Sequence, residues 1–219
     1  MSEVDVFDFP LVNVLTRTSG RPKFFKENSE SVHGQTYKNI RHIVSVEDEH
    51  DLKYVMKSSH DSDWVRVFRK DRKEEYDIWH SPYNLYCNNL MDHVDDGWIM
   101  FLDDDDLFTE PTAVEQIVNC IRNENDLLIW KTQFADKVLP GRSFGVQVAR
   151  YEFPSFCFMF HSKHKWAAQW DEVKESDYRV GVKLETVLNP IWIDCIFTKI
   201  NYSEHIGSGG GYGKGKDKL

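Results

Sequence analysis

Residues 98–106 have the sequence WIMFLDDDD, a short apolar run followed directly by four aspartates. A continuous apolar run of this length, ended by polar residues, is typical of a strand buried on both faces. Open α/β sheets bind ligands beyond the carboxyl ends of their strands, where Asp103 to Asp106 would lie. Four adjacent carboxylates need a compensating cation, and oxygen ligands suit Mg2+ or Mn2+ shared with substrate phosphates. The stretch predicts a metal and diphosphate site, with an acidic, solvated loop as the alternative.

The overall composition limits the classes of partner. The chain has 219 residues, 41% of them hydrophobic, and a formal net charge of −9. This acidic balance argues against a general nucleic-acid or anionic-membrane binder, although a local basic pocket is compatible with it. No apolar run approaches 18 residues, so we expect no membrane span. Four widely spaced cysteines and a start without signal-peptide features indicate reduced thiols and a cytoplasmic protein.

Strand-like and helix-like stretches alternate around the acidic run. This alternation predicts an α/β fold with a mainly parallel central sheet and helices on both faces. Strands are expected at residues 11–16, 40–46, 64–68, 98–102, 127–130, 153–160 and 191–200. Helices are expected at residues 22–33, 52–57, 82–93, 113–122, 163–169 and 177–188. Residues 207–219 are rich in glycine and lysine, so we expect a flexible tail there.

Polar residues follow the first two predicted strands. Arg17 and Arg21 flank a Ser/Thr/Gly loop, a suitable place to meet a phosphate or a nucleobase. Glu47 and Asp48 end the second strand and could accept hydrogen bonds from a base or a ribose. The alternatives are an ordinary strand-to-helix turn at the arginines and a solvated loop at the acids.

The second half carries aromatic residues and a second group of acids. Trp166 and Trp170 could face sugar rings, with core packing as the alternative. His161 lies near Cys157 and His164, but no fourth zinc ligand is apparent, so we expect it in a pocket or on the surface. A carboxylate could serve as a general base, or could simply begin a solvated helix. The candidates for this base are Asp171, Glu172, Glu175 and Asp177.

Taken together, these motifs resemble family-2-type glycosyltransferases with the GT-A fold, over roughly residues 11–208. The matching stretches are LTRTSGRP (15–22), HGQTYKNIRHIVSVED (33–48), FLDDDD (101–106) with its DxD metal motif, Ser176-Asp177-Tyr178 and YSEHIGS (202–208). The chain departs from the family pattern at Arg41, Cys87 and Ser176, where an acid, an arginine and a glutamate are usual. The size and the TRTSGRP opening also resemble short glycosyltransferases encoded by algal viruses.

The resemblance implies a Rossmann-like GT-A domain over residues 1–206. Residues 1–100 would be the nucleotide-binding half, and residues 101–206 the metal and acceptor half with a smaller β element. The implied donor-binding residues are Thr16, Arg17, Thr18, Arg21, Glu47, Asp48, Asn88, Asp103 and Asp104. The implied metal ligands are Asp103, Asp105 and His205, and the implied catalytic base is Asp177. Trp166, Trp170 and His161 would lie on the acceptor side.

The implied reaction is an inverting, metal-dependent sugar transfer from a nucleotide-sugar to an acceptor hydroxyl. A UDP-sugar donor, a Mn2+ or Mg2+ cofactor and a glycan or glycoprotein acceptor are expected, in the cytoplasm or, for a viral protein, the host cytoplasm. One alternative is a nucleotidyltransferase that makes nucleotide-sugars, although the loop after the first strand has only one glycine, Gly20. The other alternative is a catalytically silent sugar-binding domain with the same fold.

Overall fold

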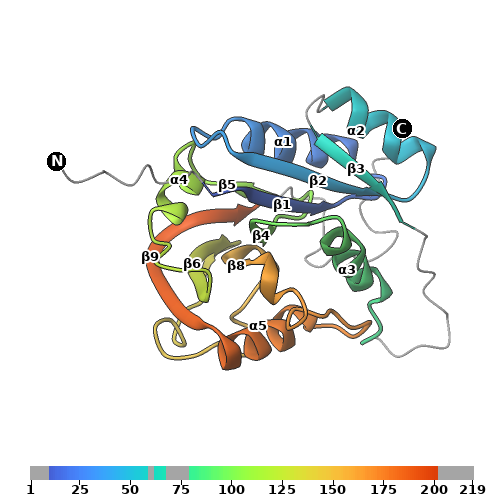
Figure 1. Ribbon diagram of the computed structural model, residues 1–219. Coiled ribbons are helices and arrows are strands. Elements are labelled where there is room, and N and C mark those ends of the chain that lie inside the picture. Colours follow the sequence, from blue (N-terminus) through green and yellow to red (C-terminus); the bar gives the residue numbers. More distant parts are fainter. Residues whose placement is uncertain (1–9, 59–61, 68–78, 202–219) are drawn as a thin grey trace.

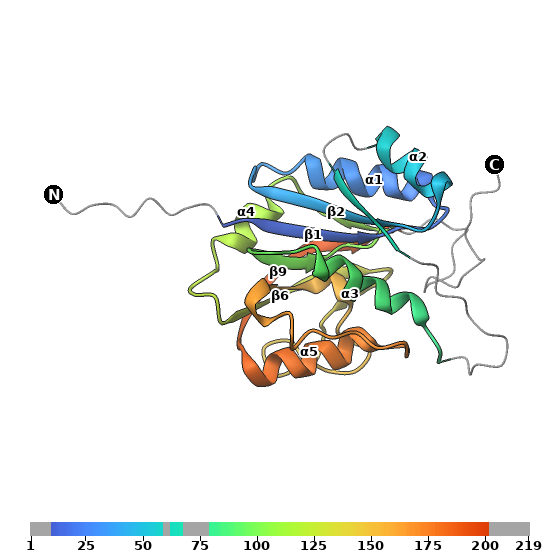
Figure 2. The same ribbon diagram turned by 45° about the vertical axis from the view of Figure 1, so that its right-hand side comes forward.

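A nine-stranded mixed sheet organises the protein. The computed structural model describes residues 10–58, 62–67 and 79–201. The strands follow the order β3-β2-β1-β4-β8-β6-β9-β5 across the sheet, and β7 pairs with β6 outside this path. Helices α1 and α2 cover one face, and α3 and α5 cover the other (Figures 1 and 2). No helix among the described residues is long and apolar enough to cross a membrane.

The first half of the sheet is parallel, as the strand–helix alternation predicts. Its four strands are β1 (Val12–Arg17), β2 (Ile40–Val46), β3 (Ser62–Arg66) and β4 (Trp98–Phe101). The connecting helices are α1 (Pro22–His33), α2 (Glu49–Ser58) and α3 (Leu85–Asp92), the last preceded by a 3-10 turn over Pro82–Asn84. Pro22 begins α1, where its missing N–H group needs no partner. Strand β4 is buried along its whole length.

The second half mixes strand directions. Its elements are β5 (Asp106–Phe108), α4 (Ala113–Val118), β6 (Asp126–Phe134), β7 (Lys137–Leu139), β8 (Phe158–His161), α5 (Ser176–Val187) and β9 (Asn189–Ile200). Strand β8 lies antiparallel between β4 and β6, whereas β9 is parallel to β6. Strand β5 pairs antiparallel with β9. The predicted α/β class is confirmed, and the second half combines one parallel strand pair, β6 with β9, with antiparallel pairs.

In the second half, three predicted elements are shorter than expected. The strand predicted at 153–160 is limited to β8, because a 3-10 turn over Ser155–Cys157 follows Pro154. The helix predicted at 163–169 is a 3-10 turn over Ser162–His164. Helix α4 ends at Val118, four residues before the expected end at Arg122. The predicted tail at 207–219 lies outside the described residues, and the predicted division into two functional halves near residue 100 stays a prediction.

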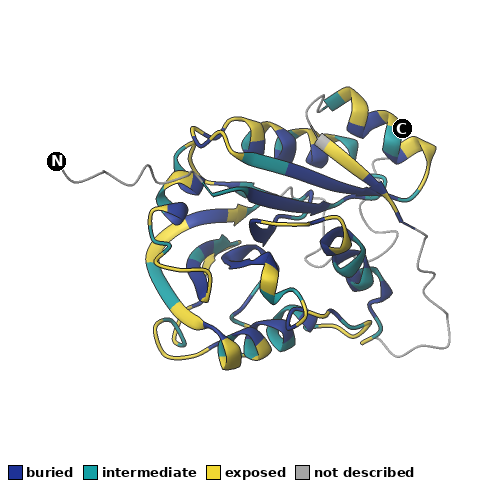
Figure 3. Ribbon diagram, in the orientation of Figure 1, coloured by how far each residue is buried: buried dark blue, intermediate teal, exposed yellow. Residues whose placement is uncertain are grey.

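The register between β1 and β4 positions the acidic run. Leu15 pairs with Phe101, and the backbone continues in step, because Leu102 N donates to Leu15 O at 3.0 Å. One step further, Asp104 N donates to Arg17 O at 3.2 Å. The loop after β1 and the acids after β4 therefore leave the same edge of the sheet side by side. The residues of the strands that lead to this edge are mostly buried (Figure 3).

Candidate functional site

The four aspartates after β4 alternate between solvent and interior. The side chains of Asp103 and Asp105 are each 17% exposed, whereas that of Asp104 is fully buried. Asp106 is also buried, at the start of β5. A tight turn produces this alternation, with Asp106 N donating to Asp103 O at 2.8 Å. Asp103 and Asp105 are thus the two carboxylates of this run that a ligand can reach.

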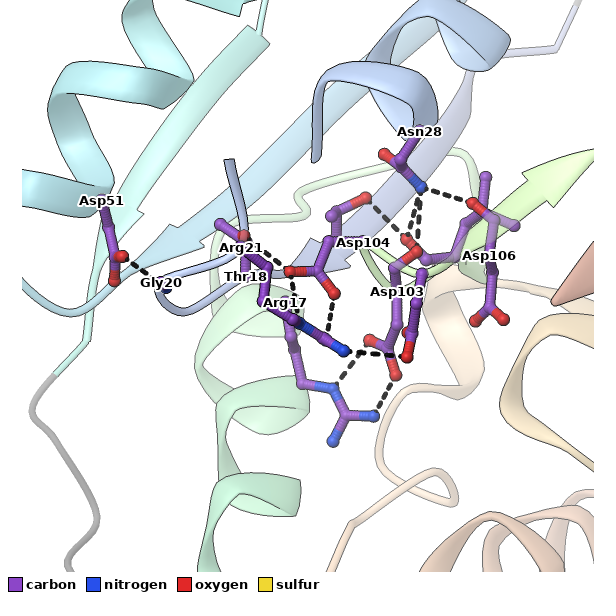
Figure 4. Close-up of polar contacts among 12 residues, drawn as sticks. Arg17, Thr18, Gly20, Arg21, Asn28, Asp51, Asp103, Asp104 and Asp106 are labelled. Carbon is purple, nitrogen blue, oxygen red and sulfur yellow. Dashed lines mark hydrogen bonds and ion pairs between the residues drawn. The ribbon is translucent and has the colours of Figure 1, made fainter. Parts of the chain in front are cut away.

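Asn28 of α1 holds this turn in place (Figure 4). Its Nδ2 donates to the backbone carbonyls of Asp103 and Asp106, each at 2.9 Å, and lies 3.3 Å from the carbonyl oxygen of Leu102. Asn28 is fully buried, so these carbonyls have no access to water in its place. The sequence analysis missed this residue, because an asparagine in a helix seven residues after Arg21 carries no motif of its own.

Two arginines of the β1–α1 loop neutralise the acidic run (Figure 4). Arg17 grips Asp103 with two nitrogens, and its Nε donates to Asp103 Oδ1 at 2.8 Å. Arg21 likewise grips Asp104, and its Nη1 also donates to Asp105 Oδ2 at 2.8 Å. Bidentate guanidinium–carboxylate pairs of this kind are strong and fix geometry. The compensating cations expected for the acids are therefore present in the chain itself.

Burial changes the protonation of the two inward-facing acids. It raises the pKa of Asp104 to about 7, against the opposing effect of Arg21. The pKa of Asp106 is also raised above its ordinary value, first by burial and then by the negative charge of Asp105. Thr18 Oγ1 donates to Asp104 at 2.8 Å and lies 2.7 Å from the hydroxyl oxygen of Tyr54. The four acids therefore do not carry four full negative charges at neutral pH.

Trp170 lies next to Arg17. The Arg17 guanidinium carbon is 5.9 Å from the centre of the indole ring, and the ring meets Phe101 edge-on with 5.0 Å between centroids. Asn88 of α3 fixes this position, because its amide exchanges two 2.9 Å hydrogen bonds with the backbone of Trp170. The structure thus places Trp170 beside Arg17, and Asn88 holds it there; the predicted place of Trp170 on the acceptor side stays a prediction.

Asp177 differs from the other three candidate bases in its partners. Asp171 pairs with Arg179, Glu175 pairs with Arg150, and Glu172 lies 3.5 Å from His80. Among the described residues, Asp177 has no ion-pair partner within 4 Å. Its carboxylate instead accepts a 2.9 Å hydrogen bond from Tyr178 N.

The environment of Asp177 raises the pKa of its carboxyl group toward neutral pH. Burial raises the pKa of Asp177 to about 6, opposed by the Tyr178 N–H group and by the positive charge of Arg17. This carboxyl group is therefore electrostatically coupled to the same arginine that grips Asp103. A base with a pKa near the working pH is suited to proton transfer. Its role as the base stays a prediction.

The end of β2 is organised by hydrogen bonds within the protein. Glu47 accepts a 2.8 Å hydrogen bond from the hydroxyl of Tyr86. Asp48 caps α2, because its Oδ1 accepts from the backbone N–H groups of His50 and Asp51, both at 2.9 Å. Asp51 in turn accepts from Gly20 N and Glu47 N, at 2.9 and 3.1 Å, and so joins the loops after β1 and β2. The predicted contacts of Glu47 and Asp48 with a nucleotide stay predictions.

Some predicted site residues lie elsewhere. Thr16 is fully buried within the sheet and donates a 2.7 Å hydrogen bond to Leu102 O. His161 pairs with Trp98 at the start of β4, roughly 15 Å of strand away from Asp103, because β8 runs antiparallel to β4. His161 therefore lies at the opposite end of β4 from the acidic turn, and its predicted place on the acceptor side stays a prediction. Trp166 is 57% exposed, and His205 lies outside the described residues.

The donor set of the acidic turn fits a hard divalent cation. Mg2+ is typically bound through one or two carboxylates together with substrate phosphates, and Asp103 and Asp105 present two partly exposed carboxylates. In the part of the chain that the structure describes, three possible ligand atoms converge within 4.8 Å only at Asp48, His50 and Asp51. The acidic turn is therefore not a complete protein cage, and a phosphate-bearing ligand would have to complete it.

Known structures resemble this arrangement. No protein-family model matches the sequence, and no curated protein matches it either. Residues 1–349 of S. aureus TarS superpose with a TM-score of 0.68 at 13% identity, covering 87% of this chain and 60% of that one. TarS with UDP-GlcNAc gives a TM-score of 0.67 at 14% identity, covering 89% and 59%.

A third similar structure is the mannosyltransferase PcManGT from Pyrobaculum calidifontis in complex with GDP-Man and Mn2+. It superposes with a TM-score of 0.66 at 13% identity, covering 89% of this chain and 58% of that one. The chain thus spans about three fifths of PcManGT and of residues 1–349 of TarS, and 37% of a longer TarS chain. The likeness confirms the predicted GT-A fold, and at such low identity it speaks for the fold alone.

Proposed function

We propose that the protein is a glycosyltransferase that moves a sugar from a nucleotide-sugar to an acceptor hydroxyl. One observation carries the proposal. Two reachable carboxylates, Asp103 and Asp105, lie beside two equally half-buried arginines, Arg17 and Arg21, at the carboxyl edge of the sheet, in a fold shared with TarS and PcManGT. Carboxylates suit a divalent cation and guanidinium groups suit phosphate, so both partners of a metal-bound diphosphate are provided.

The donor would lie across the loops that follow β1, β2 and β4. Arg17 and Arg21 are the cations that would face the diphosphate, and Glu47 and Asp48 lie at the neighbouring strand end for the base and ribose. A divalent cation, Mn2+ or Mg2+, would be held by Asp103 and Asp105 and would add positive charge beside the departing phosphate. The similar structures hold UDP-GlcNAc or GDP-Man, and we propose a UDP-sugar for this chain.

The acceptor would approach from the side of α5. Asp177 is the one member of its acidic group without a nearby cation among the described residues, so its carboxylate is free to accept a proton from the acceptor hydroxyl. The oxygen would then attack the anomeric carbon opposite the leaving diphosphate, which inverts the configuration of the sugar. A glycan or glycoprotein is the proposed acceptor. The four free cysteines fit a reducing compartment such as the cytoplasm.

A panel of nucleotide-sugars, supplied with Mn2+ and mixed glycan acceptors, tests the proposal by the release of nucleoside diphosphate. Asp105→Asn should lower the rate of nucleoside diphosphate release by roughly 100-fold or more, because it removes one of the two carboxylates of the acidic run, Asp103 and Asp105, that a ligand can reach. Asp95→Asn is the matched control, since Asp95 is exposed and precedes β4 instead of following it. Chelation with EDTA should also stop turnover.

Three other outcomes would change the assignment. Undiminished release in EDTA would refute the role of the metal. Pyrophosphate release from a nucleoside triphosphate and a sugar phosphate would favour the nucleotidyltransferase. Tight nucleotide-sugar binding without turnover on any acceptor would favour the silent sugar-binding domain.

A further inference from the structure

Two exposed aromatic side chains and one arginine form a surface group beside α5. Tyr151 is 68% exposed and Trp79 is 38% exposed. The guanidinium carbon of Arg150 lies 4.9 Å from the ring centre of Tyr151 and 5.9 Å from that of Trp79. Arg150 also pairs with Glu175, so its charge is balanced. We call Trp79, Arg150 and Tyr151 the aromatic platform.

The loop that carries Tyr151 is anchored at several points. Glu152 accepts hydrogen bonds from the backbone N–H groups of Gly141 and Ser143, at 3.1 and 3.0 Å. Glu185 of α5 accepts from Val148 N at 3.0 Å. The platform is therefore held on the same helix whose first turn carries Asp177.

The backbone of the platform adopts a conformation that side chains rarely favour. Tyr151 has a φ of 66° and Glu175 a φ of 63°, both in the left-handed region. Among the described residues only one other non-glycine, Ala135 in the β6–β7 turn, has a positive φ. A residue with a side chain is strained in this backbone conformation. Because the Tyr151 ring is exposed, the strain is not offset by burial of the ring. Strain retained at an exposed position points to a function there.

A short series of contacts joins the platform to the donor side. Lys174 N donates to Trp79 O at 2.8 Å, and His80 pairs with Val173 in an antiparallel bridge. Asn84 then links the two sides, because its Nδ2 donates to Val173 O at 2.9 Å and its Oδ1 accepts from Arg17 at 3.4 Å. The segments before α3 and before α5 lie next to each other in Figures 1 and 2.

We propose that the aromatic platform is a carbohydrate-binding subsite for the acceptor, a proposal that rests on the proposed function. The apolar C–H face of a pyranose ring can pack on an aromatic ring, and the polar rim of the sugar can hydrogen-bond to Arg150 and Glu175. Glu175 directly precedes α5 and Asp177 lies in its first turn, so the platform and that carboxylate lie at the same end of α5. The acceptor class is then an oligosaccharide instead of a single sugar.

Single exposed aromatic residues are common and carry no such meaning. Trp64 on β3 is 46% exposed and is one of these, far along the sheet from α5. The platform differs because its two rings share one arginine and because its backbone is strained. Trp64 therefore serves as the matched control.

Binding of cellotetraose, chitotetraose and mannotetraose by calorimetry, with and without UDP and Mn2+, tests the subsite. Trp79→Ala and Tyr151→Gly should each raise the Kd of the oligosaccharide that binds best by at least tenfold. Trp64→Ala should leave this Kd unchanged, and Trp79→Tyr, which keeps an aromatic face, should restore most of the affinity. Tyr151→Gly removes the ring and relieves the positive φ, so its Tm should stay the same or rise while its affinity falls.

Wild-type affinity in both platform variants, or no binding of any of the three oligosaccharides by the wild type, would overturn the proposal. The Kd of UDP and of GDP with Mn2+, measured in the same proteins, separates the two proposals. A wild type that binds neither UDP nor GDP contradicts the proposed function, whereas normal nucleotide binding with unchanged oligosaccharide affinity in the variants contradicts only the subsite.

Discussion

Removal of the Asn28 side chain should loosen the acidic turn more than any change at its surface. In Asn28→Ala, the carbonyls of Asp103 and Asp106 lose donors that lie at 2.9 Å. A buried acceptor left without its donor costs about 1–3 kcal/mol. Asp103 O keeps a second donor, Asp106 N, so the total should lie near the lower end, at about 2–4 kcal/mol.

Chemical and thermal unfolding measure this loss. For a chain of 219 residues, 1 kcal/mol shifts Tm by about 2–4 °C, so we expect Tm to fall by roughly 5–15 °C. Ser29→Ala is the matched control, since Ser29 is the next residue of α1 and is equally buried. Its hydroxyl has no hydrogen-bond partner among the described residues, so its removal should change stability by no more than about 0.5 kcal/mol. Equal stabilities of the two variants would refute the role given to Asn28.

Asn28→Asp keeps the shape of the side chain and reverses its chemistry. The new carboxyl group would present an oxygen to carbonyl oxygens, next to Asp106, whose pKa burial has already raised. We expect a larger loss of stability than in Asn28→Ala above neutral pH. The loss should shrink on acidification, because the protonated group can donate again. Urea unfolding from pH 5 to pH 8 follows this trend, and a loss that does not depend on pH would contradict it.

Two further predictions concern α5. Because burial raises the pKa of Asp177 to about 6, the transfer rate should rise with pH through about 6, and Asp177→Asn should lower it by roughly 100-fold and abolish this step in kcat/KM. The pKa of Asp177 is higher in the folded chain than in the unfolded chain, so binding of this proton stabilises the folded state at low pH. The free energy of unfolding should therefore fall as the pH rises from about 4 to 6 in the wild type, but not in the variant. In Gly181→Ala the added carbon would lie 2.4 Å from Phe153 Cε1. The cost of this steric clash should exceed the gain in helix propensity, so the free energy of unfolding should fall by about 1–2 kcal/mol. A variant as stable as the wild type in urea would contradict this reading of the α5 contact.

The elements that follow local rules were predictable. Helix α1 matches its expected bounds of 22–33 because Pro22 marks its start, and β2 matches residues 40–46 because its apolar run ends at acids. The place of the acids after β4 was predictable for the same reason. That Asp103 and Asp105 face outward follows from the geometry of the turn.

The missed features depend on contacts between distant parts of the chain. The direction of β8 cannot be read from its sequence, and this direction alone moves His161 to the far end of β4. The pairing of Arg17 with Asp103 joins residues that are 86 positions apart. The contact of the Asn88 amide with the backbone of Trp170 joins residues 82 positions apart, while the donor contact that the resemblance implies for Asn88 stays a prediction. Local sequence patterns identify the chemical groups of the candidate site, and tertiary packing determines which of these groups contact one another.

The pairing of β5 with β9 also has a kinetic consequence. Among the described strands, β5 has no neighbour other than β9, and Asp106 pairs with Ile200 near the far end of the chain. Asn201 N adds a 2.6 Å hydrogen bond to Asp105 O. The pairing of Asp106 with Ile200 closes a long loop of chain, which is slow and entropically unfavourable. Contacts within residues 12–101 should therefore form earlier. On a ribosome, a nascent chain would pair the parallel strands β1 to β4 first and would add the contacts of β5 and Asp105 with the end of β9 last, after β9 has emerged.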